Sequence, residues 1–316
     1  MMTLTQLEYV LAVDRYRHFG RAAKACFVTQ PTLSMQLHKL EEDLGIVLFD
    51  RSKKPILPTP SGKAVIEQAR SVITEMKKLE MLTKPTGLEV SGEYKLAVIP
   101  TLSPYVIPLF LENFSKKCPK VKFQIEELQT QQILQALEQD DIDAGLLVTP
   151  LGVDHLDEQV LFYEPFDLYL NPKHELAKKT KITEEDLDGS DLWLLNEGHC
   201  FRSQMIRICS LGKKNSVLKN VQFESGNLET LKRLVEMNGG YTLLPRLATY
   251  KLPATSRALV RQIAAPVPSR EVSLVVRRLN LKKPVLDALK AEILSAVPAE
   301  LSREKTKKME VVKIKV

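Results

Sequence analysis

Apolar residues recur at helical spacing through the first part of the chain. A first helix is predicted from the apolar residues Leu4, Leu7, Val10, Leu11 and Val13. An alanine-rich helix over 20–26 follows, and after a tight turn Thr29 is placed to cap a third helix with Pro31 in its first turn. That helix ends at Gly45, and its inward face carries Leu33, Leu37, Leu40 and Leu44. Two helices joined by a tight turn predict a helix-turn-helix, although any small three-helix unit shows a similar pattern.

The outer face of the third helix is polar and mostly uncharged. It carries Gln30, Thr32, Ser34, Gln36 and Lys39. Side chains of these types read base edges in the major groove or bind phosphates. A basic turn over 52–55, which includes Lys54, then predicts a hairpin wing able to lie on the DNA backbone or minor groove. The pattern therefore predicts double-stranded DNA as a partner.

A longer helix is predicted from about 59 to 82. Its apolar residues alternate by four and three, as in a coiled-coil seam formed by Val65, Ala69, Val72, Met76 and Leu79. A two-fold dimer through this helix would set two recognition helices at the spacing of a palindrome. The alternative is a helix packed on its own domain. The break over 85–92 marks a domain boundary.

Beyond this break, strand-like and helix-like segments alternate. A first series predicts strands over 94–99, 121–128 and 142–148, with helices over 103–117 and 131–139. A second series predicts strands over 192–196, 221–224 and 241–244, with helices over 201–211 and 228–238. Such alternation indicates βαβ units with parallel sheets. Joined by 160–170 and returning through 271–277, the two series predict two lobes with a cleft between them.

A possible reactive thiol lies in the stretch from 196 to 210. Cys200 directly follows His199, and a helix N-terminus with nearby cations would lower the pKa of its thiol. In a helix, Cys209 would lie roughly 13 Å away, beyond the 7 Å or so that a disulfide spans, so that bonding would require unwinding. The alternative is that both cysteines are buried apolar residues, as expected for Cys26 and Cys118. The spacing does not match paired zinc ligands, so no metal is expected.

Three further residues lie where such folds bind ligands, at strand ends near helix N-termini. Thr101 and Thr130 each follow a predicted strand, as His199 and Cys200 do, and Arg270 lies just before the strand over 271–277. Each threonine could instead be only a helix cap, and the arginine could be solvated.

The composition of the chain bears on its charge distribution and on the cellular compartment that we expect. The net charge of +6 is concentrated in residues 1–84, with 13 Lys+Arg against 9 Asp+Glu, and in residues 301–316, with 6 against 2. The first excess fits a polyanion partner, and the basic tail is expected to be a solvated extension. No signal peptide or apolar run of membrane-spanning length occurs, which predicts a cytoplasmic protein whose thiols are normally reduced.

Five motifs resemble the LysR-type transcriptional regulators. They are FGRAA at 19–23, VTQPTLS at 28–34, LEEDLG at 40–45, LFDR at 48–51 and TPSG at 59–62. The resemblance implies a winged helix-turn-helix reading a partly symmetric operator, followed by an α/β effector domain similar to periplasmic solute-binding proteins. It also implies that Thr32, Ser34 and Arg51 contact DNA.

Within that group the chain resembles the peroxide-sensing OxyR branch. The matching residues are 99–101, 104–105, 129–132, 198–200, Arg202, Gln204, Cys209, 243–245 and 268–270. The resemblance implies hydrogen peroxide as effector, Cys200 as peroxidatic thiol and Cys209 as resolving thiol. It also implies a peroxide pocket formed by Thr101, Thr130, His199 and Arg270. The chain departs from the pattern between Met205 and Ile208, and over 212–215.

Together these observations predict a DNA-binding domain over 1–60, a dimerisation helix over 61–88 and a redox-sensing domain over 89–300. Its lobes would be 89–163 with 268–300, and 164–267, before a tail over 301–316. We expect a homodimer through the linker helix, a homotetramer and contact with RNA polymerase, without a cofactor, a membrane or enzymatic turnover. Two alternatives stay open, namely a LysR-type regulator whose cleft binds a small organic anion, and a thiol peroxidase.

Overall fold

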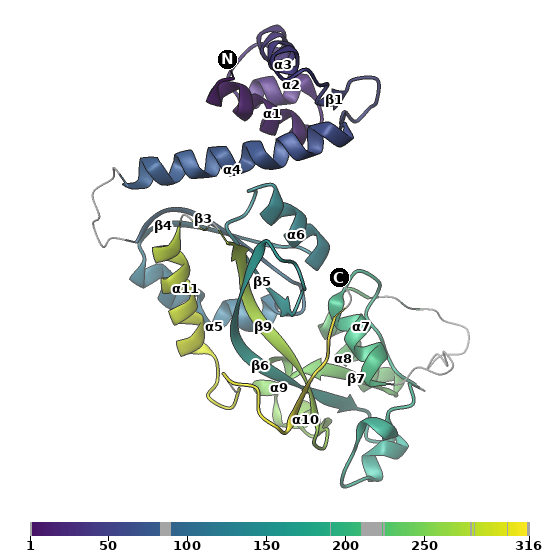
Figure 1. Cartoon of the computed structure of the whole chain (residues 1–316). Helices are drawn as coiled ribbons and strands as arrows, with labels where there is room; N and C mark the ends of the chain where they lie inside the picture. Colours follow the sequence, from purple (N-terminus) through teal and green to yellow (C-terminus); the bar gives the residue numbers. More distant parts are fainter. Residues whose placement is uncertain are drawn as a thin grey trace. The chain divides into compact units, whose positions relative to one another are not determined.

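The structure, a computed structural model, describes residues 2–82, 90–189, 191–209, 223, 225–278, 280, 282–301 and 303–314. Two compact units divide the chain at 88/89. The first is mainly helical, and the second combines a large sheet with helices (Figure 1). Among the described helices, none has both the length and the apolar character that crossing a bilayer requires.

The first unit begins with the predicted helix-turn-helix. Its three helices are α1 (Leu4–Tyr16), α2 (Phe19–Ala25) and α3 (Gln30–Leu44). Thr29 caps α3 by accepting a hydrogen bond from the Thr32 amide, and Gly45 ends it in the left-handed conformation, as predicted. Leu33, Leu37 and Leu40 are fully buried. The prediction is wrong for Leu44, which is 37% exposed, because it lies at the last helical position where the chain turns away.

The predicted wing is an antiparallel hairpin of β1 (Phe49–Asp50) and β2 (Leu57–Pro58). The long helix α4 (Pro60–Leu82) begins directly after it. Gly62 is required at this junction, because a Cβ atom there would lie 2.1 Å from the Leu48 carbonyl oxygen. The hairpin and the start of α4 are thereby held against each other.

One face of α4 packs on its own unit. Ile66, Ala69 and Ile73 are buried, the last two in a cluster with Leu7 of α1. Of the predicted seam, Ala69 therefore belongs to this internal contact, whereas Leu79 is 64% exposed. The helix thus packs internally and still presents part of the seam outward.

The second unit is built on one sheet with the strand order β4-β3-β5-β9-β6-β7. Its first series comprises β3 (Ser91–Val98), α5 (Ser103–Lys117), β4 (Lys120–Glu127), α6 (Thr130–Glu138) and β5 (Ala144–Thr149). The pairs β3–β4 and β3–β5 are parallel, which confirms the predicted βαβ units. Two long antiparallel strands, β6 (Leu156–Leu170) and β9 (Val267–Arg277), continue the sheet side by side (Figure 1).

The second series differs in part from the prediction. It contains α7 (Cys200–Ile208), α8 (Leu228–Asn238) and β7 (Tyr241–Pro245). The strand predicted over 192–196 is wrong, because Leu192 and Leu195 make only isolated bridges, to Tyr241 and Ser225. The predicted strand over 221–224 falls almost entirely outside the described residues, and the divergent residues 212–215 fall wholly outside them. Of the domain break predicted over 85–92, residues 85–89 also lie outside, and the prediction is wrong at its end because β3 already begins at Ser91.

Several elements went unpredicted. They are the short helices η1 (Glu175–Lys178), η2 (Glu184–Asp186), α9 (Arg246–Tyr250) and α10 (Ala254–Arg257), the strand β8 (Val260–Gln262), the helix α11 (Lys283–Ala296) and the strand β10 (Met309–Val311). The described part of the second unit has two hydrophobic cores. One gathers around α5, α6 and α11, with Phe110, Leu146 and Leu289 at its centre. The other gathers around α7 and α8, with Met205 and Leu243.

The prediction that residues 301–316 form a solvated tail is wrong for the part of this segment that the structure describes. Leu301 is buried in the first core, and β10 pairs in parallel with β9. Val312 is only 4% exposed and belongs to the second core. The basic residues described in this segment are exposed while Leu301 and Val312 are buried, so the charge count alone was misleading.

Candidate functional site

Cys200 is the first residue of α7, and the loop before it is tightly constrained. Gly198 has a φ of +90°, and a Cβ atom there would lie 2.5 Å from the side-chain oxygen of Gln129. The loop that carries the thiol therefore packs directly on the start of α6, so that elements of both series meet at the sulfur.

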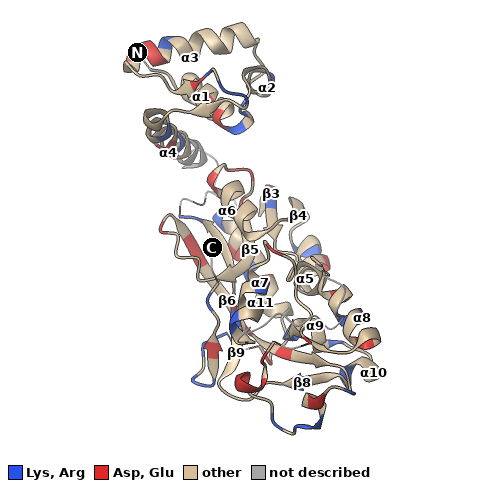
Figure 2. Cartoon of the chain, turned by 90° about the vertical axis from the view of Figure 1, so that its right-hand side faces the viewer, with Lys and Arg blue, Asp and Glu red and all other residues tan. Residues whose placement is uncertain are grey.

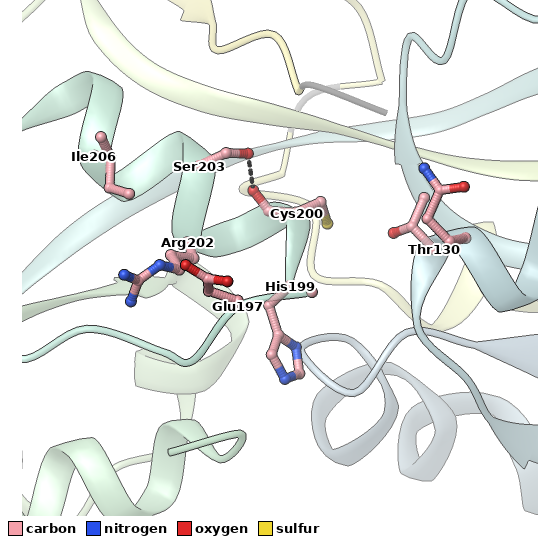
Figure 3. A pocket seen from close by; sticks show the side chains of 9 residues that line it. Thr130, Glu197, His199, Cys200, Arg202, Ser203 and Ile206 are labelled. Atoms are coloured by element: carbon pink, nitrogen blue, oxygen red, sulfur yellow. Dashed lines mark hydrogen bonds between the residues drawn. The ribbon is translucent and has the colours of Figure 1, made fainter. Parts of the chain in front are cut away.

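A pocket opens beside this thiol. Its lining residues are Thr130, Gln131, Glu197, Gly198, His199, Cys200, Arg202, Ser203 and Ile206. Figure 3 shows the Cys200 sulfur pointing toward Thr130, whereas Arg202 extends away from it. The structure thus brings together three of the predicted site residues, Thr130, His199 and Cys200.

Thr130 is not the helix cap that the alternative interpretation required. Gln129 occupies the N-cap position of α6 and forms a capping box with Gln132. The Thr130 hydroxyl is buried and has no hydrogen-bond partner among the described residues. An unpaired buried hydroxyl that faces a sulfur is available to a small polar molecule or to the thiolate itself.

Thr101 and Arg270 lie in an adjoining buried network and do not line the pocket. The fully buried Arg270 donates to the Glu164 carboxylate, with Nε to Oε2 at 2.8 Å. Its Nη1 donates to the Thr101 hydroxyl at 3.1 Å and its Nη2 to the Thr101 carbonyl at 3.1 Å. The guanidinium also lies 5.6 Å from the ring centroid of Phe201, the residue after Cys200. Arg270 is therefore not solvated, and its positive charge acts on the Cys200 thiol electrostatically.

Burial dominates the protonation of the thiol. Cys200 is half-buried, and desolvation raises the pKa of its thiol, while the Thr130 hydroxyl, the positive charge of Arg270 and the first amides of α7 act in the opposite direction. Burial also lowers the pKa of His199, so its imidazole is neutral at pH 7 and supplies no cation. The expectation of a net acidic thiol is thereby corrected, because the reduced fold favours the protonated form.

Cys209 ends the same helix at its C-cap position. It is fully buried in the second core, and burial raises the pKa of its thiol to about 12. Both cysteines are free, and nine residues of helix place them about 13 Å apart. Of the other two cysteines, Cys118 is buried and Cys26 is half-buried. Within the described residues, no group of three or more His, Cys, Asp or Glu could hold a metal.

The predicted DNA-contacting residues divide into exposed and tethered groups. Gln30, Thr32 and Lys54 are exposed, and Ser34 is half-buried. The Gln36 side chain accepts a hydrogen bond from Gln6 at 3.2 Å. Lys and Arg are interspersed with Asp and Glu over the second unit (Figure 2). The basic excess of residues 1–84 belongs to the first unit, which also carries the predicted DNA-contacting residues.

Arg51 is anchored within its own unit. Its guanidinium donates to the Glu41 carboxylate at 2.7 Å and lies 5.2 Å from the Phe19 ring centroid. Glu41 also accepts from the Leu48 amide at 2.8 Å, a role that sequence analysis missed. The carboxylate therefore fixes the wing to α3.

Comparison with known families assigns the class of protein. The model of the bacterial regulatory helix-turn-helix protein, lysR family, matches residues 4–63, and the LysR substrate binding domain matches residues 88–298. The chain belongs to the LysR family of transcriptional regulators, within its OxyR-like branch.

The branch follows from individual relatives. The hydrogen peroxide-inducible genes activator of Haemophilus influenzae is 36% identical over 279 residues, covering 87% of this chain and 91% of that protein. The DNA-binding transcriptional dual regulator OxyR of Escherichia coli K12 is 34% identical over 276 residues, covering 87% and 90%. Full-length OxyR from Pseudomonas aeruginosa, as a cysteine-to-aspartate variant, aligns with a TM-score of 0.76 and 30% identity, covering 94% of this chain and 99% of that one.

Proposed function

We propose that this LysR-family regulator senses hydrogen peroxide by oxidation of Cys200 and switches transcription when Cys200 and Cys209 form a disulfide. The observation that carries the proposal is the Cys200 sulfur at a pocket, facing the unpaired Thr130 hydroxyl, with a second thiol at the other end of the same helix. Support comes from the relatives named for peroxide induction and from a cysteine variant of OxyR from Corynebacterium glutamicum described as bound to hydrogen peroxide, at 26% identity.

The chemistry begins at the sulfur. The Cys200 thiolate attacks one peroxide oxygen, the O–O bond breaks, and the other oxygen leaves as hydroxide and takes up a proton to become water. Two electrons pass from sulfur to peroxide, which leaves a sulfenic acid. The Thr130 hydroxyl and the first amides of α7 would stabilise the developing charge, and the positive charge of Arg270 would add to this stabilisation.

The second step couples chemistry to shape. The Cys209 thiolate attacks the sulfenic sulfur, the S–O bond breaks, and hydroxide leaves and is protonated to water as the disulfide forms. Since the cysteines lie about 13 Å apart in α7 and a disulfide needs Cα atoms within about 7 Å, the helix must unwind. Thr101, His199 and Arg270 would then act around the thiol, His199 as a neutral ring and the other two through their buried network.

The switched output is DNA binding by an oligomer in the cytoplasm. Thr32, Ser34, Gln30 and Gln36 would read an operator, with Arg51 and Lys54 on its backbone. Dimerisation through α4, assembly to a tetramer and contact with RNA polymerase complete the proposal. Peroxide is an effector consumed once per switching event, so the protein is a regulator and not a thiol peroxidase.

A variant series tests the proposal. After one equivalent of hydrogen peroxide, we expect mass spectrometry to find the Cys200–Cys209 disulfide in the unaltered chain, sulfenic acid at Cys200 in Cys209→Ser, and no oxidation at position 209 in Cys200→Ser. Cys118 serves as an internal control. Free thiols at both positions in the unaltered chain would overturn the proposal.

That outcome would favour the organic-anion alternative. The structure weighs against this alternative at one point, since Arg270, the cation expected to hold a carboxylate, is already paired with Glu164. Rapid peroxide turnover with a reductant would instead favour the peroxidase.

A further inference from the structure

The C-terminal segment lies outside the region matched by the substrate-binding-domain model, which ends at residue 298, and yet it is part of the fold. The Val267 amide donates to the Lys308 carbonyl at 2.7 Å, and the Val312 amide donates to the Ser269 carbonyl at 2.9 Å. These bonds flank β10 and hold it along β9, and Val312 is buried in the second core. In Figure 1 the yellow segment follows β9 and ends beside α7.

The same segment holds the redox helix at its middle. Gln204 lies between Cys200 and Cys209 on α7, is fully buried, and donates from Nε2 to the Val312 carbonyl at 2.8 Å. Its other amide atom, Oε1, has no partner among the described residues. The bond to Val312 is therefore the side-chain hydrogen bond that orients this amide, and it joins α7 to the tail across 108 residues of sequence.

We propose that residues 309–314 form a strap that controls closure of the Cys200–Cys209 disulfide, with Gln204 and Val312 as positioning residues. This inference rests on the proposed function. Unwinding α7 carries Gln204 away from the Val312 carbonyl, so the strap stabilises the reduced helix and opposes the step in which Cys209 displaces hydroxide from the sulfenic sulfur. Oxidation of Cys200 takes place at the pocket before any unwinding, and the strap leaves it unchanged.

Two variants and one matched control separate these steps. Gln204→Met keeps the side-chain length and removes the hydrogen bond, leaving no new polar group unpaired on α7. A chain ending at Lys308 removes the strap altogether. Lys313→Ala alters an exposed side chain of the same segment, and the contacts of Val312 stay in place.

The measurements use the unaltered chain, the two full-length variants and the chain ending at Lys308, each treated with hydrogen peroxide. The rate of disulfide closure is measured by acid quenching and mass spectrometry. We expect it to be about fivefold higher in Gln204→Met, because the loss of one net hydrogen bond corresponds to a change of about this size. In thiol–disulfide buffers the reduction potential should fall by about 20 mV, which is a fivefold change for a two-electron couple. The truncated chain should show a larger shift in the same direction, and Lys313→Ala should show none.

Sulfenic acid formation distinguishes failure of the strap from failure of the sensor. In a Cys209→Ser background, trapping of the sulfenic acid should proceed at the same rate with and without Gln204→Met. If that rate is unchanged and closure and potential are unchanged too, the strap is overturned and the sensor stands. If Cys200 forms no sulfenic acid in any chain, the proposed function is overturned and the strap with it.

Discussion

Among single residues, Arg270 shows how strongly the site depends on pairing inside the protein. Its guanidinium and the Glu164 carboxylate are both fully buried and are joined by two contacts below 3 Å. A buried charge without its partner is costly, whereas a paired one is tolerated.

We therefore expect Arg270→Met to lower the free energy of unfolding by about 3–5 kcal/mol, because Glu164 is left buried and uncompensated. Denaturant titration of the second unit's fluorescence measures the loss, since Trp193 lies in it. The double variant Arg270→Met with Glu164→Leu is the control and should recover part of the stability. A single variant as stable as the unaltered chain would contradict this account.

A second residue prediction concerns the acidity of the thiol. Thr130→Val removes the hydroxyl that lowers the pKa of Cys200, so burial acts with less opposition and the thiol pKa should rise further. Alkylation of Cys200 should then be slower at neutral pH, and its pH profile should move to higher pH. Thr180→Val, at an exposed threonine, is the control. An unmoved profile would show that Thr130 does not act on the sulfur.

For single residues, the sequence predicted the site where neighbouring residues in the chain carry the information. Cys200, His199 and Thr130 were each expected beside a helix start, and they line one pocket, although the strand predicted before His199 is absent. The partner of Arg270 lies 106 residues away along the chain, and no periodicity points to it. Whether burial or the helix N-terminus decides the pKa of Cys200 likewise depends on packing, which spacing does not reveal.

Secondary-structure elements were predicted best where the sequence has a continuous apolar face and clear signals for the first and last residues of the element. The helices α5 and α8 have the bounds that their patterns predicted. The segment 192–196 is apolar enough for a strand but pairs by isolated bridges, since pairing depends on neighbours distant in sequence. The strand β10 was not recognised because lysines surround it in the sequence, although Met309 and Val311 are apolar and Val312 follows directly.

A pH-dependent electrostatic interaction links two of these elements, η2 and β10. The pKa of Glu184 is raised by burial and by the negative charge of Glu310, with Arg207 of α7 opposing. A carboxyl whose pKa is higher in the folded state destabilises that state once the pH exceeds its ordinary value of 4.5, and has no effect well below it.

Glu184→Gln should therefore raise the melting temperature at pH 7, and the gain should shrink as the pH falls toward 4 and the native carboxyl becomes protonated. Thermal unfolding across this range gives the measurement. Glu185→Gln, at the neighbouring exposed carboxylate, is the matched control. A gain that persists at pH 4, or none at pH 7, would refute the assignment of the destabilising charge.

For the whole molecule, the central question is how the chain would read the two-fold operator that we propose. A single helix-turn-helix presents few base-reading side chains, and a dimer doubles the contact and fixes the half-site spacing. The helix α4 uses Ile66, Ala69 and Ile73 within its own unit and leaves Leu79 64% exposed on another part of its surface. An exposed leucine on a predicted seam is the place where a second copy would pack.

Leu79→Asp should therefore separate the proposed dimer and leave the first unit folded, because the side chain does not contribute to that unit's buried clusters. Sedimentation analysis should report a smaller species, and binding to a palindromic operator should weaken by at least tenfold at fixed salt, since a single unit loses the second half-site. Gln68→Asp places the same charge at an exposed polar position of α4 and should change neither result. If the Leu79 variant keeps both its mass and its operator affinity, then α4 does not join the copies and the DNA-binding units must be paired through another surface.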